Sequence, residues 1–159
     1  MAVMKQTCLI VADGEKARLF VVVPDDNPRR KVRLVEQTTL HSADFNARGR
    51  NGAGGVASER NTNRQAGPVH PVGAQRERHR LEQERRFGAA IVKSAVALTA
   101  DWSEGGMVLI AEPRLLGLMR ERLRGALKKH ITLAELAKDY SSLTTAALEK
   151  IVIAQRLAQ

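Results

Sequence analysis

An arginine-rich, aliphatic-poor stretch between Arg48 and Arg86 divides this chain and most constrains how it can fold. It opens with a glycine-rich segment at residues 48–55 and closes with a charged, helix-like pattern at residues 75–86. Nine arginines, no lysines and four acids lie within it, so it carries +5 of the formal net charge of +9. So few apolar side chains cannot form a core. We therefore predict a flexible basic loop over residues 41–75 that leads into a helix.

The apolar segments on either side of this stretch predict one α/β domain spanning residues 1–159. Before it, apolar runs separated by Asp-Gly and Pro turns predict three antiparallel strands near residues 7–12, 17–23 and 31–39. After it, the periodicity predicts a helix, a strand at 107–111, a helix that begins near Pro113, a segment at 131–136 and a final helix. Residues 131–136 suit a last strand, although their pattern also suits a helix.

Start signals mark the last helix most clearly. Thr144 is a favourable N-cap, and Leu143 and Leu148 have the spacing of a hydrophobic staple. Three antiparallel strands followed by helix-connected strands make a mixed sheet of five strands. This element order is that of a ribonuclease-H-like domain.

Several classes of site find no candidate in the sequence. Cys8, in an apolar run, is the one cysteine, so no intrachain disulfide is possible and we expect a buried, inert thiol. The four histidines lack metal-ligand spacing, and no serine has a nucleophile-elbow setting. We expect no metal, no cofactor and no catalytic residue. Without a signal peptide or an apolar run of membrane-spanning length, we expect a cytoplasmic protein that does not contact a membrane.

The arginines of the basic stretch suit contact with a polyanion. Guanidinium groups bind phosphates through two parallel hydrogen bonds and stack on exposed bases. A second basic segment, Arg114 to Lys129, has six basic residues and one acid. The alternative is a solvated loop and a helix in which Glu77, Glu82 and Glu84 pair with neighbouring arginines. The residues predicted to bind RNA are Arg48, Arg50, Arg60, Arg64, Arg76, Arg78, His79, Arg80, Arg120 and Arg124.

A metal-dependent nuclease is a minor alternative, because ribonuclease-H-like folds often hold two metals with carboxylates. Asp13 and Glu112 follow strands that would be neighbours, and Glu84 lies on the helix between them in the sequence. Local structure already explains the first two: Asp13 suits its Asp-Gly turn, and Glu112 suits a helix N-terminus.

Four segments resemble the bacterial host attachment protein family. Val11–Phe20 reads VADGEKARLF, His79 and Phe87 stand eight residues apart, Val108–Arg120 reads VLIAEPRLLGLMR, and Lys138–Thr144 reads KDYSSLT. The family is named for a presumed requirement in attachment to host cells. It is in turn similar to the central domain of archaeal and eukaryotic class I peptide-chain release factors. There, a glycine-rich loop before a long basic helix carries a Gly-Gly-Gln tripeptide into the ribosome, which implies contact with tRNA or the ribosome here.

This chain departs from the release-factor pattern at the tripeptide. Val56 follows Gly54-Gly55, and Gly-Gly-Gln occurs nowhere in the sequence. A further departure is Tyr140-Ser-Ser, where the family has a histidine in the corresponding segment. We therefore expect non-catalytic RNA binding by a translation, rescue or hibernation factor associated with the ribosome or tRNA. The alternative is a host-attachment or protein-interaction factor with no nucleic-acid role.

Overall fold

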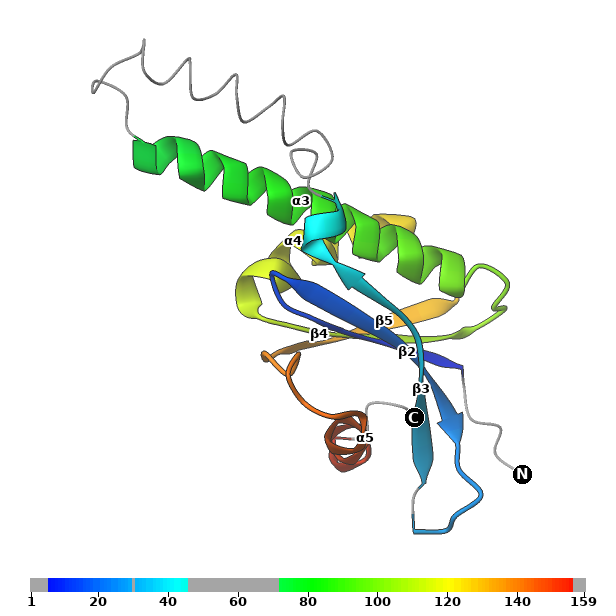
Figure 1. Ribbon diagram of the computed structural model, residues 1–159. Helices are drawn as coiled ribbons and strands as arrows, with labels where there is room; N and C mark the ends of the chain where they lie inside the picture. Colours follow the sequence, from blue (N-terminus) through cyan, green and yellow to red (C-terminus); the bar gives the residue numbers. More distant parts are fainter. Residues whose placement is uncertain (1–5, 30, 46–71, 156–159) are drawn as a thin grey trace.

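The computed structural model describes residues 6–29, 31–45 and 72–155, which form a mixed five-stranded sheet with helices on both faces (Figure 1). In chain order the elements are β1 (Thr7–Ala12), β2 (Lys16–Pro24), β3 (Val32–His41), the 3-10 helix η1 (Ser42–Phe45), α3 (Val72–Leu98), β4 (Gly105–Ala111), α4 (Pro113–Ala126), β5 (Ile131–Ala137) and α5 (Thr145–Ala154).

The sheet has the strand order β3-β2-β1-β4-β5. β1 pairs antiparallel with β2, and β2 pairs antiparallel with β3. β1 pairs in parallel with β4, and β4 in parallel with β5. The predicted arrangement of three antiparallel strands followed by helix-connected parallel strands is therefore confirmed, including the strand at 131–136 that had remained ambiguous.

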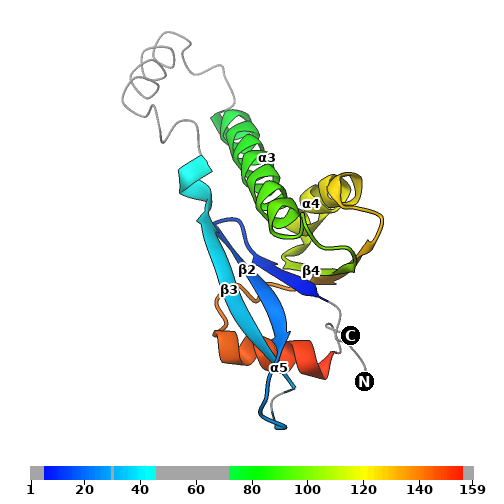
Figure 2. The same cartoon turned by 90° about the vertical axis from the view of Figure 1, so that its right-hand side faces the viewer.

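Two hydrophobic clusters lie on opposite faces of the sheet. α3 and α4 cover one face, where Phe87 and Ile91 of α3 and Met119 of α4 are fully buried against alternate residues of β1 and β4 (Figure 2). α5 covers the other face through Leu148 and Val152. Every residue of β1 is buried, as a central strand covered on both faces requires.

Capping residues set the beginnings of α4 and α5. The Glu112 carboxylate accepts a hydrogen bond from the Leu115 amide, and Pro113 occupies the first helical position. Thr144 caps α5 by accepting from the Ala147 amide at 3.1 Å. Leu143 packs against the hydrophobic cluster that contains Leu148, which is consistent with the predicted staple.

The structure corrects several boundaries of the sequence analysis. β3 continues to His41 and is followed by η1, while α3 begins at Val72 rather than near Gln75. Both ends of the predicted 41–75 loop are thus regular structure, and residues 46–71 lie outside the described ranges. Cys8 is fully buried, and burial raises the pKa of its thiol to about 12.

No helix in the described ranges combines the length and the apolar character that crossing a membrane requires.

Candidate nucleic-acid interface

The first half of α3 extends past the ends of the strands (Figure 1), and its side chains are largely in solvent. The sequence explains why the first half of the helix is exposed and the second half is buried. Between residues 73 and 86 the one large apolar side chain is Leu81, whereas Phe87, Ile91 and Ala95 repeat at the spacing that places them on the sheet. The exposed half of α3, residues 73–86, is called the projecting segment below.

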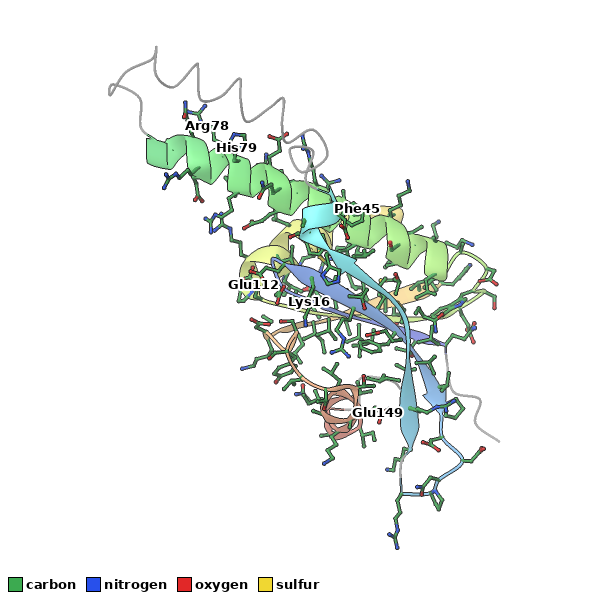
Figure 3. The ribbon with its side chains drawn as sticks, viewed as in Figure 1. Lys16, Phe45, Arg78, His79, Glu112 and Glu149 are labelled. Atoms are coloured by element: carbon green, nitrogen blue, oxygen red, sulfur yellow. The ribbon has the colours of Figure 1, made fainter. Side chains whose placement is uncertain are left out.

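The predicted RNA-binding residues fall into three groups. Arg48, Arg50, Arg60 and Arg64 lie outside the described residues. Arg76, Arg78, His79 and Arg80 lie on the projecting segment and are exposed. Figure 3 shows Arg78 and His79 near the start of α3, on the side away from the sheet. Arg120 and Arg124 lie on α4.

The arginines of the projecting segment differ in what they contact. Arg76, Arg78 and Arg85 form no ion pair with any residue in the described ranges. Among the described residues, nothing competes with an external anion for these three cationic groups. Arg85 was not among the predicted site residues, although its seven-residue spacing from Arg78 places both on one side of the helix.

Other arginines of the same segment are paired along the helix, as the alternative interpretation predicts. Arg80 donates to both carboxylate oxygens of Glu77, at 2.6 and 2.7 Å, and Arg86 pairs with Glu82 at 2.6 Å. The hydrogen bond from Arg80, followed by that from Arg114, lowers the pKa of Glu77. The hydrogen bond to Glu77 raises the pKa of Arg80. These pairs are exposed, so each contributes little to stability.

Arg114, at the start of α4, joins the projecting segment to the domain. Its Nη2 lies 3.0 Å from Glu77 Oε1 and its Nε lies 3.2 Å from Glu84 Oε2. The two carboxylates are seven residues apart, which places both on one side of α3. Sequence reasoning missed this link, although the Glu77–Glu84 spacing was a signal for it. Arg114 therefore holds the projecting segment along two turns.

Arg120 and Arg124 have a partner within the fold. Arg120 Nε lies 2.8 and 2.9 Å from the two oxygens of Glu135 on β5, and Arg124 Nη2 lies 3.8 Å from the same carboxylate. RNA contact by these two residues remains a prediction, and in Arg120 the Nε is already bonded to Glu135. Arg76, Arg78 and Arg85 face no such competition from the described residues.

The carboxylates considered for a nuclease each have a structural role. Glu112 caps α4, Glu84 faces Arg114, and Asp13 Oδ1 accepts from the amides of Glu15 and Lys16 at 2.7 and 2.8 Å. Glu112 directly follows the last residue of β4 (Figure 3). Within the described ranges no group of three or more histidine, cysteine or acidic residues is placed to hold a metal ion.

Asp13 and Arg18 connect the β1–β2 hairpin to the segment before α5. Ser141 Oγ donates to Asp13 Oδ2 at 2.5 Å. Arg18 donates to the Leu143 carbonyl at 2.7 Å and to Thr145 Oγ1 at 3.1 Å, and it pairs with Glu36 at 3.0 Å. Segments 11–20 and 138–144, which carry two parts of the family resemblance, are thus linked to each other by hydrogen bonds. The motif residues Asp13 and Arg18 hold the fold together there.

Comparison with known proteins identifies a family but no activity. A family model described as "Protein required for attachment to host cells" matches residues 8–152. A search of curated proteins found no match.

One solved structure to which the chain is similar is a Ppx/GppA phosphatase from Aquifex aeolicus. The sequence identity is 10% and the TM-score 0.39, over 83% of this chain and 36% of that one. The chain therefore spans about a third of the phosphatase's length. A likeness of this size supports no argument about function.

Proposed function

This chain belongs to the family of proteins required for attachment to host cells, and we propose that it acts as a non-catalytic RNA-binding protein. In this proposal the projecting segment of α3 and the arginine-rich sequence before it contact RNA phosphates. The ribosome or tRNA is the proposed target and the cytoplasm the proposed site of action.

The observation that carries the proposal is the set of unpaired arginines on the projecting segment. Arg76, Arg78 and Arg85 are exposed and have no ionic partner among the described residues. A helix whose guanidinium groups are unpaired among the described residues, and which extends beyond the sheet, can present them to a nucleic acid. The formal net charge of +9 attracts a polyanion from a distance.

The proposal includes two finer likenesses. The strand order β3-β2-β1-β4-β5 with helices on both faces supports a ribonuclease-H-like fold. The long basic helix after an arginine-rich segment supports docking in the manner of a release-factor central domain. Because the sequence has no Gly-Gly-Gln, the proposal covers docking and excludes peptide release by that tripeptide.

The test is co-sedimentation of the purified protein with ribosomes over a range of salt concentrations. Phosphate contacts release counterions, so the logarithm of the binding constant should fall linearly with the logarithm of the salt concentration. Two variants separate the parts of the interface: Arg76→Ala with Arg78→Ala in the described helix, and Arg48, Arg50, Arg60 and Arg64 changed to alanine before it. We expect both to bind more weakly and with a shallower salt slope.

Arg29→Ala with Arg33→Ala is the matched control, because it removes the same charge from exposed positions around the β2–β3 turn. If the control weakens binding as much as Arg76→Ala with Arg78→Ala, net charge rather than the projecting segment is responsible. Absence of co-sedimentation at low salt would refute ribosome binding.

The competing proposal is a protein-interaction role in host attachment, which the family description favours. A partner that docks on the sheet or on α5 would be insensitive to the arginine substitutions and only weakly sensitive to salt. Capture of one protein partner by both the wild type and the Arg76→Ala, Arg78→Ala variant would favour this role. A nuclease is the least supported candidate, since Asp13, Glu84 and Glu112 all have intramolecular partners.

A further inference from the structure

The two edges of the sheet differ in how they are protected. At β3, the Glu149 carboxylate of α5 accepts a hydrogen bond from the Leu34 amide at 2.8 Å, and Glu149 is buried. Figure 3 shows Glu149 beside β3. β3 also carries the exposed charges Arg33 and Glu36. A helix cover and charged side chains are the usual means of preventing another strand from pairing with an edge.

β5 forms the other edge and lacks these devices. In the described part of the chain no segment pairs with its outer side. Its sequence, ITLAELA, contains no lysine, arginine or proline. The one charge, Glu135, is taken up by Arg120 and Arg124 of α4, and its side chain is 19% exposed. An edge of seven residues whose one charge is already paired within the fold is a template for another strand.

The backbone direction along β5 follows from one hydrogen bond. The His130 carbonyl accepts from the Gly105 amide at 3.1 Å, so it points toward β4. Backbone groups alternate in direction along a strand, which turns those of Thr132, Ala134 and Leu136 toward β4. Those of Leu133, Glu135 and Ala137 then point outward. The outer edge therefore offers backbone donors and acceptors at every second residue.

We propose that two copies of this chain pair through β5, antiparallel about a two-fold axis at Ala134, and join their sheets into one. A strand edge is self-complementary under a two-fold axis, so a second copy is an occupant that fits it. This register overlaps all of β5 with its partner and sets Leu133 opposite Glu135 of the second copy. An axis at Glu135 would instead place two carboxylates opposite each other, which is unfavourable.

Dimerisation and RNA binding can be distinguished by how each depends on salt concentration. Each copy has a formal net charge of +9, so two copies repel, and added salt screens that repulsion. Hydrogen bonds and apolar contact along β5 are little affected by moderate salt. Dimerisation should therefore strengthen with salt, whereas RNA binding should weaken. Failure of either proposal leaves the other open to its own measurement.

The first measurement is the mass of the full chain, freed of nucleic acid, by sedimentation over a range of protein and salt concentrations. We expect the mass to rise toward that of two chains as protein concentration increases. Ala134→Lys places two ammonium groups opposite each other at the axis, and should raise the dissociation constant at least about tenfold. Ala154→Lys, at an exposed position of α5, adds the same charge elsewhere and should dimerise like the wild type.

A disulfide provides a direct and positive test of the register. Residues opposite each other at a non-hydrogen-bonded antiparallel position have Cα atoms about 4.5 Å apart, within the range that a disulfide spans. Ala134→Cys should therefore give a covalent dimer on mild oxidation, while Ala154→Cys should not. Cys8 is buried and does not compete. A protein that stays monomeric at all concentrations and salts, or a dimer that Ala134→Lys leaves intact and Ala134→Cys does not cross-link, would overturn the proposal.

Discussion

Ser141 donates a hydrogen bond to Asp13 at 2.5 Å although the two residues are 128 positions apart in the chain. The same hydroxyl lies 2.7 Å from Asp139 Oδ1. A hydroxyl carries one proton, so it can donate to only one of these carboxylates at a time. The turn after the central strand is thereby tied to the segment that leads into α5, and this tie depends on the ionisation of Asp13.

Asp13→Ala should lower the free energy of unfolding at neutral pH by about 1–3 kcal/mol, because it removes the acceptor for Ser141 and two amides. Burial alone would raise the pKa of Asp13, but the hydrogen bonds from Ser141, Lys16 and Glu15 lower it overall. A lowered pKa contributes stability above the unfolded-state value of about 3.9, and this contribution is lost as pH falls through the folded-state value. The deficit of the variant should shrink over that acid range.

Urea denaturation of both proteins at a series of pH values measures this deficit. Asp26→Ala, in the exposed β2–β3 turn, is the control for the removal of one surface carboxylate. A deficit that stays constant from neutral pH to below about 3.9 would show that ionised Asp13 is not the stabilising form.

Arg18→Lys should loosen α5 even though it keeps the positive charge. The Arg18 guanidinium contacts the Leu143 carbonyl, Thr145 Oγ1 and Glu36 at once, and its carbon lies 4.9 Å from the centre of the Phe20 ring. An ammonium group cannot reproduce this planar, forked contact. We expect a loss of about 1–3 kcal/mol in unfolding free energy and faster amide exchange in α5. Unchanged exchange in residues 145–154 would contradict a clamping role.

Gly105→Ala and Gly117→Ala should change stability in opposite directions. A Cβ at Gly105 would lie 2.6 Å from the Gln6 carbonyl oxygen and 2.8 Å from the Trp102 ring, which we expect to cost about 1–3 kcal/mol. A Cβ at Gly117, inside α4, meets nothing within 4 Å and should stabilise the protein by about 0.5–1 kcal/mol. Urea unfolding followed by the fluorescence of the buried Trp102 measures both. Equal effects would mean that packing at Trp102 is not the cause.

Arg114→Ala should raise amide exchange along the projecting segment while leaving residues 87–98 protected. Arg114 alone joins two carboxylates of this segment to α4 in the described structure. Arg122→Ala, on an exposed part of the same helix, is the matched control. Hydrogen exchange read by mass spectrometry distinguishes the two halves of α3. The same exchange in both variants would indicate that the projecting segment does not depend on α4.

The sequence predicted most of the fold because its signals are local. Apolar runs and turn residues located the strands, and Thr144, Leu143 and Leu148 located the start of α5. The segment at 131–136 was ambiguous, since its composition suits either a strand or a helix, and pairing with β4 decides for a strand. No local pattern indicated how deeply Trp102 is buried; it is 7% exposed, and Gly105 leaves room for its ring to pack closely.

The sequence revealed much less of the contacts between distant segments. No local pattern predicted the hydrogen bonds of Arg18 and Ser141. These bonds form because the fold brings residues 13–18 next to residues 141–145. Arg120 was predicted to bind RNA, and its ion pair with Glu135 of β5 was not foreseen. Such pairings depend on strand order and helix placement, which no local pattern encodes.

The continuity of α3 has a consequence for how the projecting segment exists in solution. An isolated helix as short as the projecting segment is only marginally stable in water, because forming its first turn fixes several residues in exchange for a single hydrogen bond. In α3 the packed half at Phe87 and Ile91 already provides that first turn, so helix propagates outward from it at one hydrogen bond per residue. Melting of the segment should therefore start at its N-terminal end and proceed toward Phe87. A polyanion that neutralises Arg76 and Arg78 would shift that melting boundary outward, and helix content would then report occupancy.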